Sequence, residues 1–142
     1  MVQAKRVSTA SEYQDALSIR RRVFIEEQGV PPHLELDEFE KEAVHFVVYD
    51  DEQAIGAGRF RTYEDHVAKV ERICILPEFR GRHLGNLLMD EIERVAKRQE
   101  YRTVRLNSQS NAIPFYEKRG YAITSPEFMD AGIPHRVMTK EL

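Results

Sequence analysis

Residues Val70 to Arg98 read VERICILPEFRGRHLGNLLMDEIERVAKR, and this stretch decides the fold. It begins as an apolar strand, is interrupted by Pro77, and passes through a basic turn into a helix with one apolar stripe. The first N–H groups of such a helix have no partner within the helix and point toward the turn. Together with the helix dipole they form an anion site, and Arg80 and Arg82 add two positive charges beside it. The stretch therefore predicts a site for a ligand that carries phosphate.

The composition is that of an ordinary globular protein. The 142 residues are the length of one domain, which we expect to span residues 1–142. A net charge of −3 disfavours nucleic-acid binding, which needs a basic surface. No apolar run is long enough for a membrane span, and the N-terminus has no signal-peptide core. The one cysteine, Cys74, excludes an internal disulfide and fits a reducing compartment, so we expect a cytoplasmic protein.

The residues before this stretch predict a helix and three strands. Val2–Val7 reads as a short strand, and the capping box Thr9–Glu12 opens a helix that should end near Gly29. The acidic segment Leu34–Glu42 is expected to contain a short second helix and to be a solvated face or a border of a substrate cleft. Three antiparallel strands joined by short turns should follow, over Ala43–Tyr49, Ala54–Thr62 and Val67–Ile75. In the second of them, Gly56 and Gly58 indicate a bulge or a close approach by another group.

The residues after this stretch complete a mixed sheet. Thr103–Asn107 is a strand reached through a helix, so it should lie parallel to the strand before that helix. Ser110 is expected to cap a helix over Asn111–Arg119. The last two strands should be Tyr121–Thr124 and His135–Lys140, with Ser125–Pro134 as their connection. The predicted fold is α+β, with a mixed, mostly antiparallel central sheet of about seven strands and helices on both faces.

Several motifs resemble the GNAT acetyltransferases, and the resemblance covers nearly the whole chain. RGRHLG, residues 80–85, is similar to the acyl-CoA loop of the family, Arg/Gln-x-x-Gly-x-Gly/Ala, with His83 in place of the middle glycine. FYEKRGY, residues 115–121, is similar to the signature of the last helix of the family. Within the family, the chain looks closest to a small bacterial branch, the YjcF-like and ElaA-like proteins. The residues that carry this likeness are Val23 to Gln28, Asp37, His45 and Gly132 to His135.

The resemblance implies a GNAT-like acyl-CoA N-acyltransferase fold, acetyl-CoA as acyl donor and no metal. In the family, a splayed strand pairs its backbone with the pantetheine arm, and one of its N–H groups can donate to the acetyl oxygen. The expected acyl-CoA site consists of Ile73, Cys74, Ile75, Arg80, Gly81, Arg82, His83, Leu84, Gly85, Asn86, Asn107, Asn111 and Phe115. The Cys74 side chain itself is expected to be a small buried hydrophobe, because it should face away from its strand neighbours and no histidine is adjacent to activate it.

Tyr116 is the expected catalytic proton donor. The family places a tyrosine at this position beside the CoA sulfur, and a phenol with a pKa near ~10 can protonate a departing thiolate. The other interpretation of Tyr116 is a core aromatic residue.

The general base and the acceptor site stay open at this stage. Glu71 is a candidate base, and it is equally well interpreted as an exposed strand residue. His45 and His135 are candidate acceptor contacts, although a histidine within an apolar strand is more often a hydrogen-bonded core residue. The acidic residues of the expected cleft edge indicate a cationic amine such as a polyamine, an amino sugar or a lysine side chain; they are Glu26, Glu27, Glu35, Asp37 and Glu38.

The favoured function is direct transfer of an acyl group from acetyl-CoA to an amine of a small molecule or peptide. The alternative is a non-catalytic acyl-CoA-binding sensor or partner module, which His83 favours. A nucleic-acid-binding module is a third hypothesis, disfavoured by the charge. Either a monomer or a homodimer is compatible with the sequence.

Overall fold

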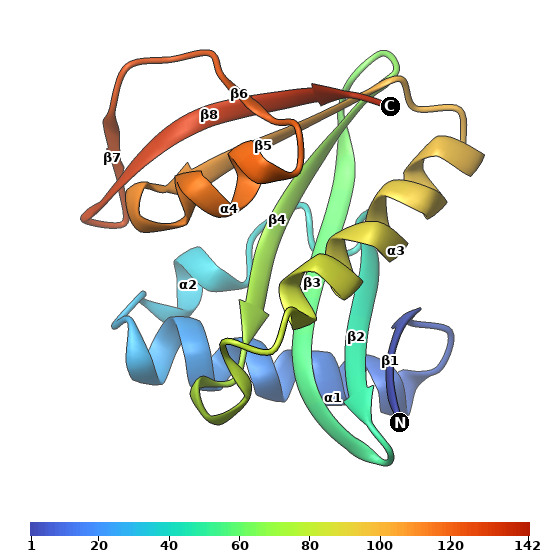
Figure 1. Ribbon diagram of the computed structural model, residues 1–142. Coiled ribbons are helices and arrows are strands. Elements are labelled where there is room, and N and C mark those ends of the chain that lie inside the picture. Colours follow the sequence, from blue (N-terminus) through green and yellow to red (C-terminus); the bar gives the residue numbers. More distant parts are fainter.

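The computed structural model describes residues 1–142, and its centre is one mixed sheet of eight strands (Figure 1). Every neighbouring pair in this sheet is antiparallel except β4 and β5. The order across the sheet is β1 (Val2–Arg6), β2 (Val44–Asp50), β3 (Gln53–Glu64), β4 (Val67–Ile75), β5 (Thr103–Gln109), β8 (Ile133–Glu141) and β6 (Ala122–Ile123). The predicted mixed, mostly antiparallel sheet is thus confirmed. The eighth strand, β7 (Phe128–Asp130), pairs with β8 and lies within the segment that we expected to be only a connection.

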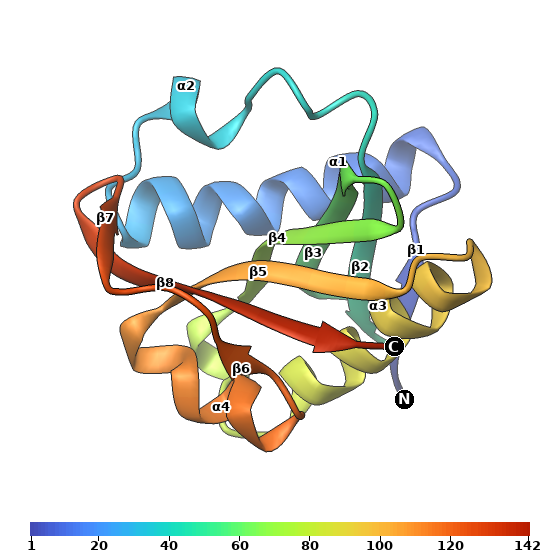
Figure 2. The same ribbon diagram turned by 90° about the horizontal axis from the view of Figure 1, so that it is seen from above.

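Helices cover both faces of the sheet, as predicted (Figure 2). On one face lie α1 (Ala10–Arg20), its π-helical continuation Arg21–Glu27, and α2 (Pro32–Glu35); on the other face lie α3 (Leu84–Arg98) and α4 (Ile113–Lys118). No helix is long and apolar enough to cross a membrane.

The helix ends show which local predictions succeed. The N-terminal cap of α1 is confirmed, because the backbone N–H of Glu12 donates to Thr9 Oγ1 at 3.1 Å. The predicted cap at Ser110 is wrong: its hydroxyl donates to Glu127 at 3.2 Å, and a short 3₁₀ turn, Ser110–Ala112, precedes α4. The difference arises because a distant carboxylate competes for the serine hydroxyl.

Two hydrophobic clusters hold the helices to the sheet. Leu88, Met89 and Ile92 of α3 pack on Phe46 and other residues of one sheet face. Ile19 of α1 packs on the opposite face in a second cluster that contains Cys74. The helix pattern of Leu84–Arg98 therefore predicted the buried side of α3 correctly.

The two glycines of β3 admit isoleucine side chains from β4. A Cβ at Gly56 would lie 2.6 Å from Ile75 Cδ1, and a Cβ at Gly58 would lie 2.6 Å from Ile73 Cδ1. The register between β3 and β4 also shifts between Ala57 and Arg59. Both the predicted bulge and the predicted close approach are therefore present.

The sheet opens where the parallel pair ends. β4 pairs with β5 only over Val67–Val70 and Thr103–Leu106, and beyond these residues the two strands separate (Figure 1). The later part of β4 keeps β3 as its neighbour, and the later part of β5 keeps β8. Arg72 lies at this opening with a left-handed φ of 62°. Backbone groups of β4 that face the gap have no strand partner, so the fold leaves room for a ligand to pair with them.

Candidate active site

A cavity of about 690 Å³ lies between the separated parts of β4 and β5 and reaches the N-terminus of α3. It gathers most of the site residues predicted from the sequence. Lining it are Glu27, Glu71, Ile73, Cys74, Ile75, Arg80, Gly81, His83, Leu84, Gly85, Asn86, Asn107, Asn111, Phe115, Tyr116 and His135. Two predicted site residues, Arg82 and His45, do not line it. The Arg82 guanidinium instead lies 5.3 Å from the centre of the Phe79 ring.

The turn before α3 keeps a glycine-like backbone despite its histidine. Gly81 has a φ of 82°, and His83 has a φ of 61° as the N-cap residue of α3. An L-residue in this conformation costs about 1–2 kcal/mol, so His83 occupies the position at some expense in stability. The His83 side chain makes no capping hydrogen bond, so the first N–H groups of α3 keep their capacity to bind an anion.

Arg80 and Glu27 form a pair that the sequence did not indicate. The two terminal nitrogens of Arg80 donate to Glu27 at 2.7 and 2.8 Å, and Arg80 Nε donates to the Ile75 carbonyl at 2.9 Å. The hydrogen bond from Arg80 lowers the pKa of Glu27. Arg80, predicted to bind phosphate, and Glu27, predicted to bind a cationic acceptor, therefore bind each other.

Gly85 brings the first turn of α3 close to α4. A Cβ at this position would lie 3.1 Å from Phe115 Cζ. Since Gly85 and Phe115 also line the cavity, any larger side chain at position 85 would project into the space beside the helix N-terminus or push Phe115 away.

Tyr116 lines the cavity, and its hydroxyl makes no hydrogen bond within the chain. Its side chain is 7% exposed and packs edge-on against Phe115 and Tyr121, with ring centres 5.0 and 5.6 Å away. Burial raises the pKa of Tyr116, and no hydrogen bond from the chain opposes this shift. The phenol is therefore neutral and keeps its proton available to a group that enters the cavity.

Asn107 adds a second polar group without a partner. Its Oδ1 is buried and accepts no hydrogen bond from the chain, although the residue lines the cavity. A buried acceptor of this kind is stabilised when a ligand N–H reaches it.

Cys74 belongs to the core, as expected. It is 5% exposed, and its thiol contacts the Ala57 carbonyl at 3.8 Å on the side of the sheet that faces α1. Burial raises the pKa of Cys74 to about 12. The thiol is therefore protonated and unreactive at neutral pH.

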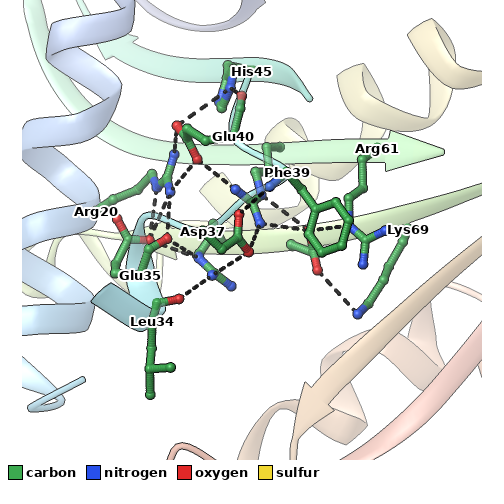
Figure 3. A network of polar contacts seen from close by, with 12 residues as sticks. Arg20, Leu34, Glu35, Asp37, Phe39, Glu40, His45, Arg61 and Lys69 are labelled. Carbon is green, nitrogen blue, oxygen red and sulfur yellow. Dashed lines mark hydrogen bonds and ion pairs between the residues drawn. The ribbon is translucent and has the colours of Figure 1, made fainter. Parts of the chain in front are cut away.

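Three carboxylates of the acidic segment after α1, Glu35, Asp37 and Glu40, are paired with arginines (Figure 3). Glu35 is 3% exposed, and it accepts hydrogen bonds from Arg20 at 2.9 Å and from Arg72 at 2.8 Å. Arg20, which is fully buried, also binds Glu40 at 2.8 Å. The interpretation as a free acidic cleft edge is therefore wrong for Glu35 and Asp37, because arginines from α1, β3 and β4 neutralise them. Glu26 and Glu38 of the same predicted edge are exposed.

Arg59 of β3 is the centre of the same network. Its buried guanidinium binds Asp37 at 2.7 Å, Glu40 at 2.6 Å and Glu71 at 2.9 Å. Arg61 and Lys69 bind Glu71 as well, each at 3.2 Å.

The ion-pair network around Glu71 determines whether this residue can act as the general base. Burial opposes ionisation of Glu71, but the charges of Arg59, Lys69 and Arg61 outweigh it and lower the pKa of Glu71. A carboxylate held by three cations is a poor proton acceptor, so the geometry favours a charge-balancing role for Glu71 over a general-base role.

The two candidate histidines differ in position. His45 lies outside the cavity: its Nε2 is 2.9 Å from the Glu40 carbonyl and its ring packs edge-on against Tyr13, so burial lowers its pKa. The prediction that His45 contacts the acceptor is therefore wrong. His135 does line the cavity, with Nδ1 fixed 2.7 Å from the Ile133 carbonyl and its ring stacked on Phe128.

Sequence reasoning missed the cations around this opening. Lys69 and Arg72 line the cavity, and Arg105 lies beside Lys69 in the sheet. The register of the strands is the feature that reveals them. The β3–β4 hairpin and the parallel pairing of β4 with β5 place Arg61, Lys69 and Arg105 in one row.

Comparisons with known proteins agree with this architecture. A family model described as an acetyltransferase (GNAT) domain matches residues 9–142. The chain is 44% identical to the "uncharacterized N-acetyltransferase YjcF" of Bacillus subtilis (strain 168), over 92% of this chain and 93% of that protein. The crystal structure of Escherichia coli ElaA superimposes with a TM-score of 0.87 at 20% identity, covering 99% of this chain and all of the other. A GNAT family acetyltransferase from Elizabethkingia anophelis with acetyl-CoA bound has a TM-score of 0.72 at 14% identity, covering 99% of this chain and 98% of the other.

Proposed function

The chain belongs to the GNAT family of acetyltransferases, and on this basis we propose that it transfers an acetyl group from acetyl-CoA directly to an amine. The observation that carries the proposal is the unpaired hydroxyl of Tyr116 in the cavity where β4 and β5 separate. A single cavity that joins this hydroxyl to the N-terminus of α3 suits a substrate with a phosphate end and a reactive thioester end.

The donor substrate fits the groups that the chain leaves unused. The N–H groups of Leu84, Gly85 and Asn86 are available for the pyrophosphate, since they form the uncapped first turn of α3. The pantetheine arm would lie along the unpaired edge of β4 near Ile73, with the buried Oδ1 of Asn107 accepting from one of its amides. The first N–H groups of α3 and Asn107 Oδ1 would thereby gain partners that they lack in the free protein.

The reaction needs few protein groups. A neutral amine nitrogen attacks the thioester carbonyl, and an N–H of β4 stabilises the oxyanion that develops. When the C–S bond breaks, the sulfur takes a proton from Tyr116 and leaves as the thiol of CoA. The attacking nitrogen, which carries an extra proton after it bonds to the carbonyl carbon, releases that proton to water, and the Tyr116 phenolate regains a proton from water before the next turnover. Because burial raises the pKa of Tyr116, its proton must move as the C–S bond breaks and not before. The raised thiol pKa of Cys74 disfavours an acyl-enzyme route.

The sensor alternative was based on His83. Since His83 adopts the left-handed conformation that a glycine would take there, the turn keeps its shape, and this argument for lost function weakens.

Isothermal titration with acetyl-CoA tests the donor half of the proposal. We expect wild-type protein to bind acetyl-CoA and CoA, but not ATP, with a micromolar Kd. Gly85→Glu should weaken binding at least about a hundredfold, because its side chain enters the phosphate turn and its charge repels phosphate.

The matched control for this experiment is His83→Gly, in the same turn. It relieves the left-handed strain without adding atoms, so it should bind acetyl-CoA at least as well as wild type. Equal affinity of wild type and Gly85→Glu would place the donor elsewhere and contradict the proposal.

A further inference from the structure

We propose that the acceptor amine carries an anionic group, a carboxylate or a phosphate, that binds Lys69 and Arg105 on the open face of β4 and β5. This inference depends on the proposed acetyltransferase activity and names the class of its second substrate. It replaces the cationic acceptor expected from the acidic residues of the sequence.

The strand register places the cations together. Lys69 of β4 pairs with Arg61 of β3 on one side and with Arg105 of β5 on the other. Directly paired residues of neighbouring strands point to the same face of a sheet, so the three side chains form one row. Lys69 and Arg105 lie one residue before the last pair of β4 and β5, beyond which the strands separate, and Lys69 also lines the cavity.

Arg105 is the member of this row with unused hydrogen-bonding capacity. No carboxylate lies within ion-pair distance of its guanidinium, which lies 4.5 Å from the centre of the Tyr63 ring. Its Nε is buried and has no hydrogen-bond partner in the chain. A partly buried guanidinium without an anion is costly, and an incoming carboxylate or phosphate removes that cost through paired hydrogen bonds.

The carboxylates near the row are already neutralised. Glu71, the one carboxylate that contacts Lys69, is shared with Arg59 and Arg61. Elsewhere in the cavity, Glu27 is bound by Arg80. Asp130 is the remaining lining carboxylate, and it belongs to β7, which pairs with the beginning of β8 and not with the Lys69 row. The surroundings of the row therefore carry an excess of positive charge.

The geometry also sets the size of the acceptor. Glu71 and Asn107 are each two residues beyond the row, where the strands have begun to part. Two residues of a strand span about 7 Å, so an anion at Lys69 and Arg105 would hold an amine within reach of the gap if three or four bonded atoms separate them. This length matches a γ-amino acid or a short aminoalkyl phosphate.

The test uses four amines of similar length on wild-type protein, which differ in the group at the end away from the reacting amine: a carboxylate in 4-aminobutanoate, a phosphate in 3-aminopropyl phosphate, a neutral amide in 4-aminobutanamide and an ammonium in 1,4-diaminobutane. They are called anionic, neutral and cationic after this end group. Calorimetry measures the binding of each amine to protein saturated with CoA, which has no acetyl group to transfer. A separate assay with acetyl-CoA measures acetyl transfer by the release of the CoA thiol. At least one anionic amine should bind about tenfold or more tightly than the neutral and cationic ones, since a charge-assisted hydrogen bond is involved. The comparison of carboxylate with phosphate identifies the anion.

The variant Arg105→Gln should abolish this preference, whereas Arg98→Gln, an exposed arginine of α3, should leave it intact. Equal or tighter binding of 1,4-diaminobutane by wild type would overturn the inference, as would an anion preference that survives in Arg105→Gln. If anionic amines bind but no thiol is released, the acetyltransferase proposal fails and the anion site stands. If only the neutral or cationic amines are acetylated, the acetyltransferase proposal stands and the anion site fails.

Discussion

Tyr116→Phe is expected to lower kcat by about 10²–10⁴-fold while the affinity for acetyl-CoA stays nearly unchanged. The substitution removes one oxygen that makes no hydrogen bond within the chain, so the aromatic packing on Phe115 and Tyr121 is kept. What is lost is the proton for the departing sulfur. Steady-state kinetics with the preferred amine, combined with calorimetry of acetyl-CoA binding, separates the two quantities.

Tyr121→Phe is the matched control for this prediction. Its hydroxyl donates to Glu93 at 2.7 Å and does not line the cavity, so its removal should reduce stability and leave kcat close to wild type. If Tyr116→Phe kept full kcat, Tyr116 would be a core aromatic only, and another group would have to protonate the thiolate.

Arg59→Met is expected to lower the free energy of unfolding by about 3–5 kcal/mol, because it removes one partner from a buried ion network. Asp37, Glu40 and Glu71 would lose the guanidinium that they share. Arg94→Met on α3 is the control: Arg94 is exposed and pairs with Glu91 at the surface, so the free energy of unfolding should stay close to the wild-type value. Urea unfolding followed by circular dichroism measures both variants.

The effect of Arg59→Met should depend on pH with a definite sign. The folded protein lowers the pKa of Asp37 and Glu71, so their ion pairs stabilise it above the ordinary carboxyl pKa and are lost as the pH falls through the lowered values. The difference between wild type and variant should therefore be complete above about pH 5 and shrink below about pH 4. A loss of less than about 1 kcal/mol at neutral pH would mean that water reaches these carboxylates freely.

The elements that the sequence predicts well are those defined by local patterns. The apolar stripe of α3, the capping box at Thr9 and the strand Val67–Ile75 depend on residues a few positions apart, and the structure contains all three. The turn before α3 also lies where the sequence predicted it, since a left-handed backbone at position 83 tolerates a histidine in place of glycine.

The predictions that fail depend on partners far apart in the chain. Glu35 looks solvent-exposed in the sequence, but Arg20 and Arg72 neutralise it in the core. Likewise, Glu27 binds Arg80, a residue assigned to the other substrate. Charge composition gives the number of carboxylates and not their partners, so it could not show that Glu27, Glu35 and Asp37 are already paired with arginines. The row of Lys69 and Arg105 became visible only once the register of three strands was known.

The measurement that tests the central claim most directly is a crystal structure of the protein with acetyl-CoA. The account predicts the pyrophosphate at the N–H groups of Leu84 to Asn86 and the pantetheine arm between the separated parts of β4 and β5. The sulfur should lie within hydrogen-bonding distance of the Tyr116 hydroxyl. A donor bound outside this gap, or a sulfur remote from Tyr116 with the acetyl group still facing the acceptor side, would contradict the account.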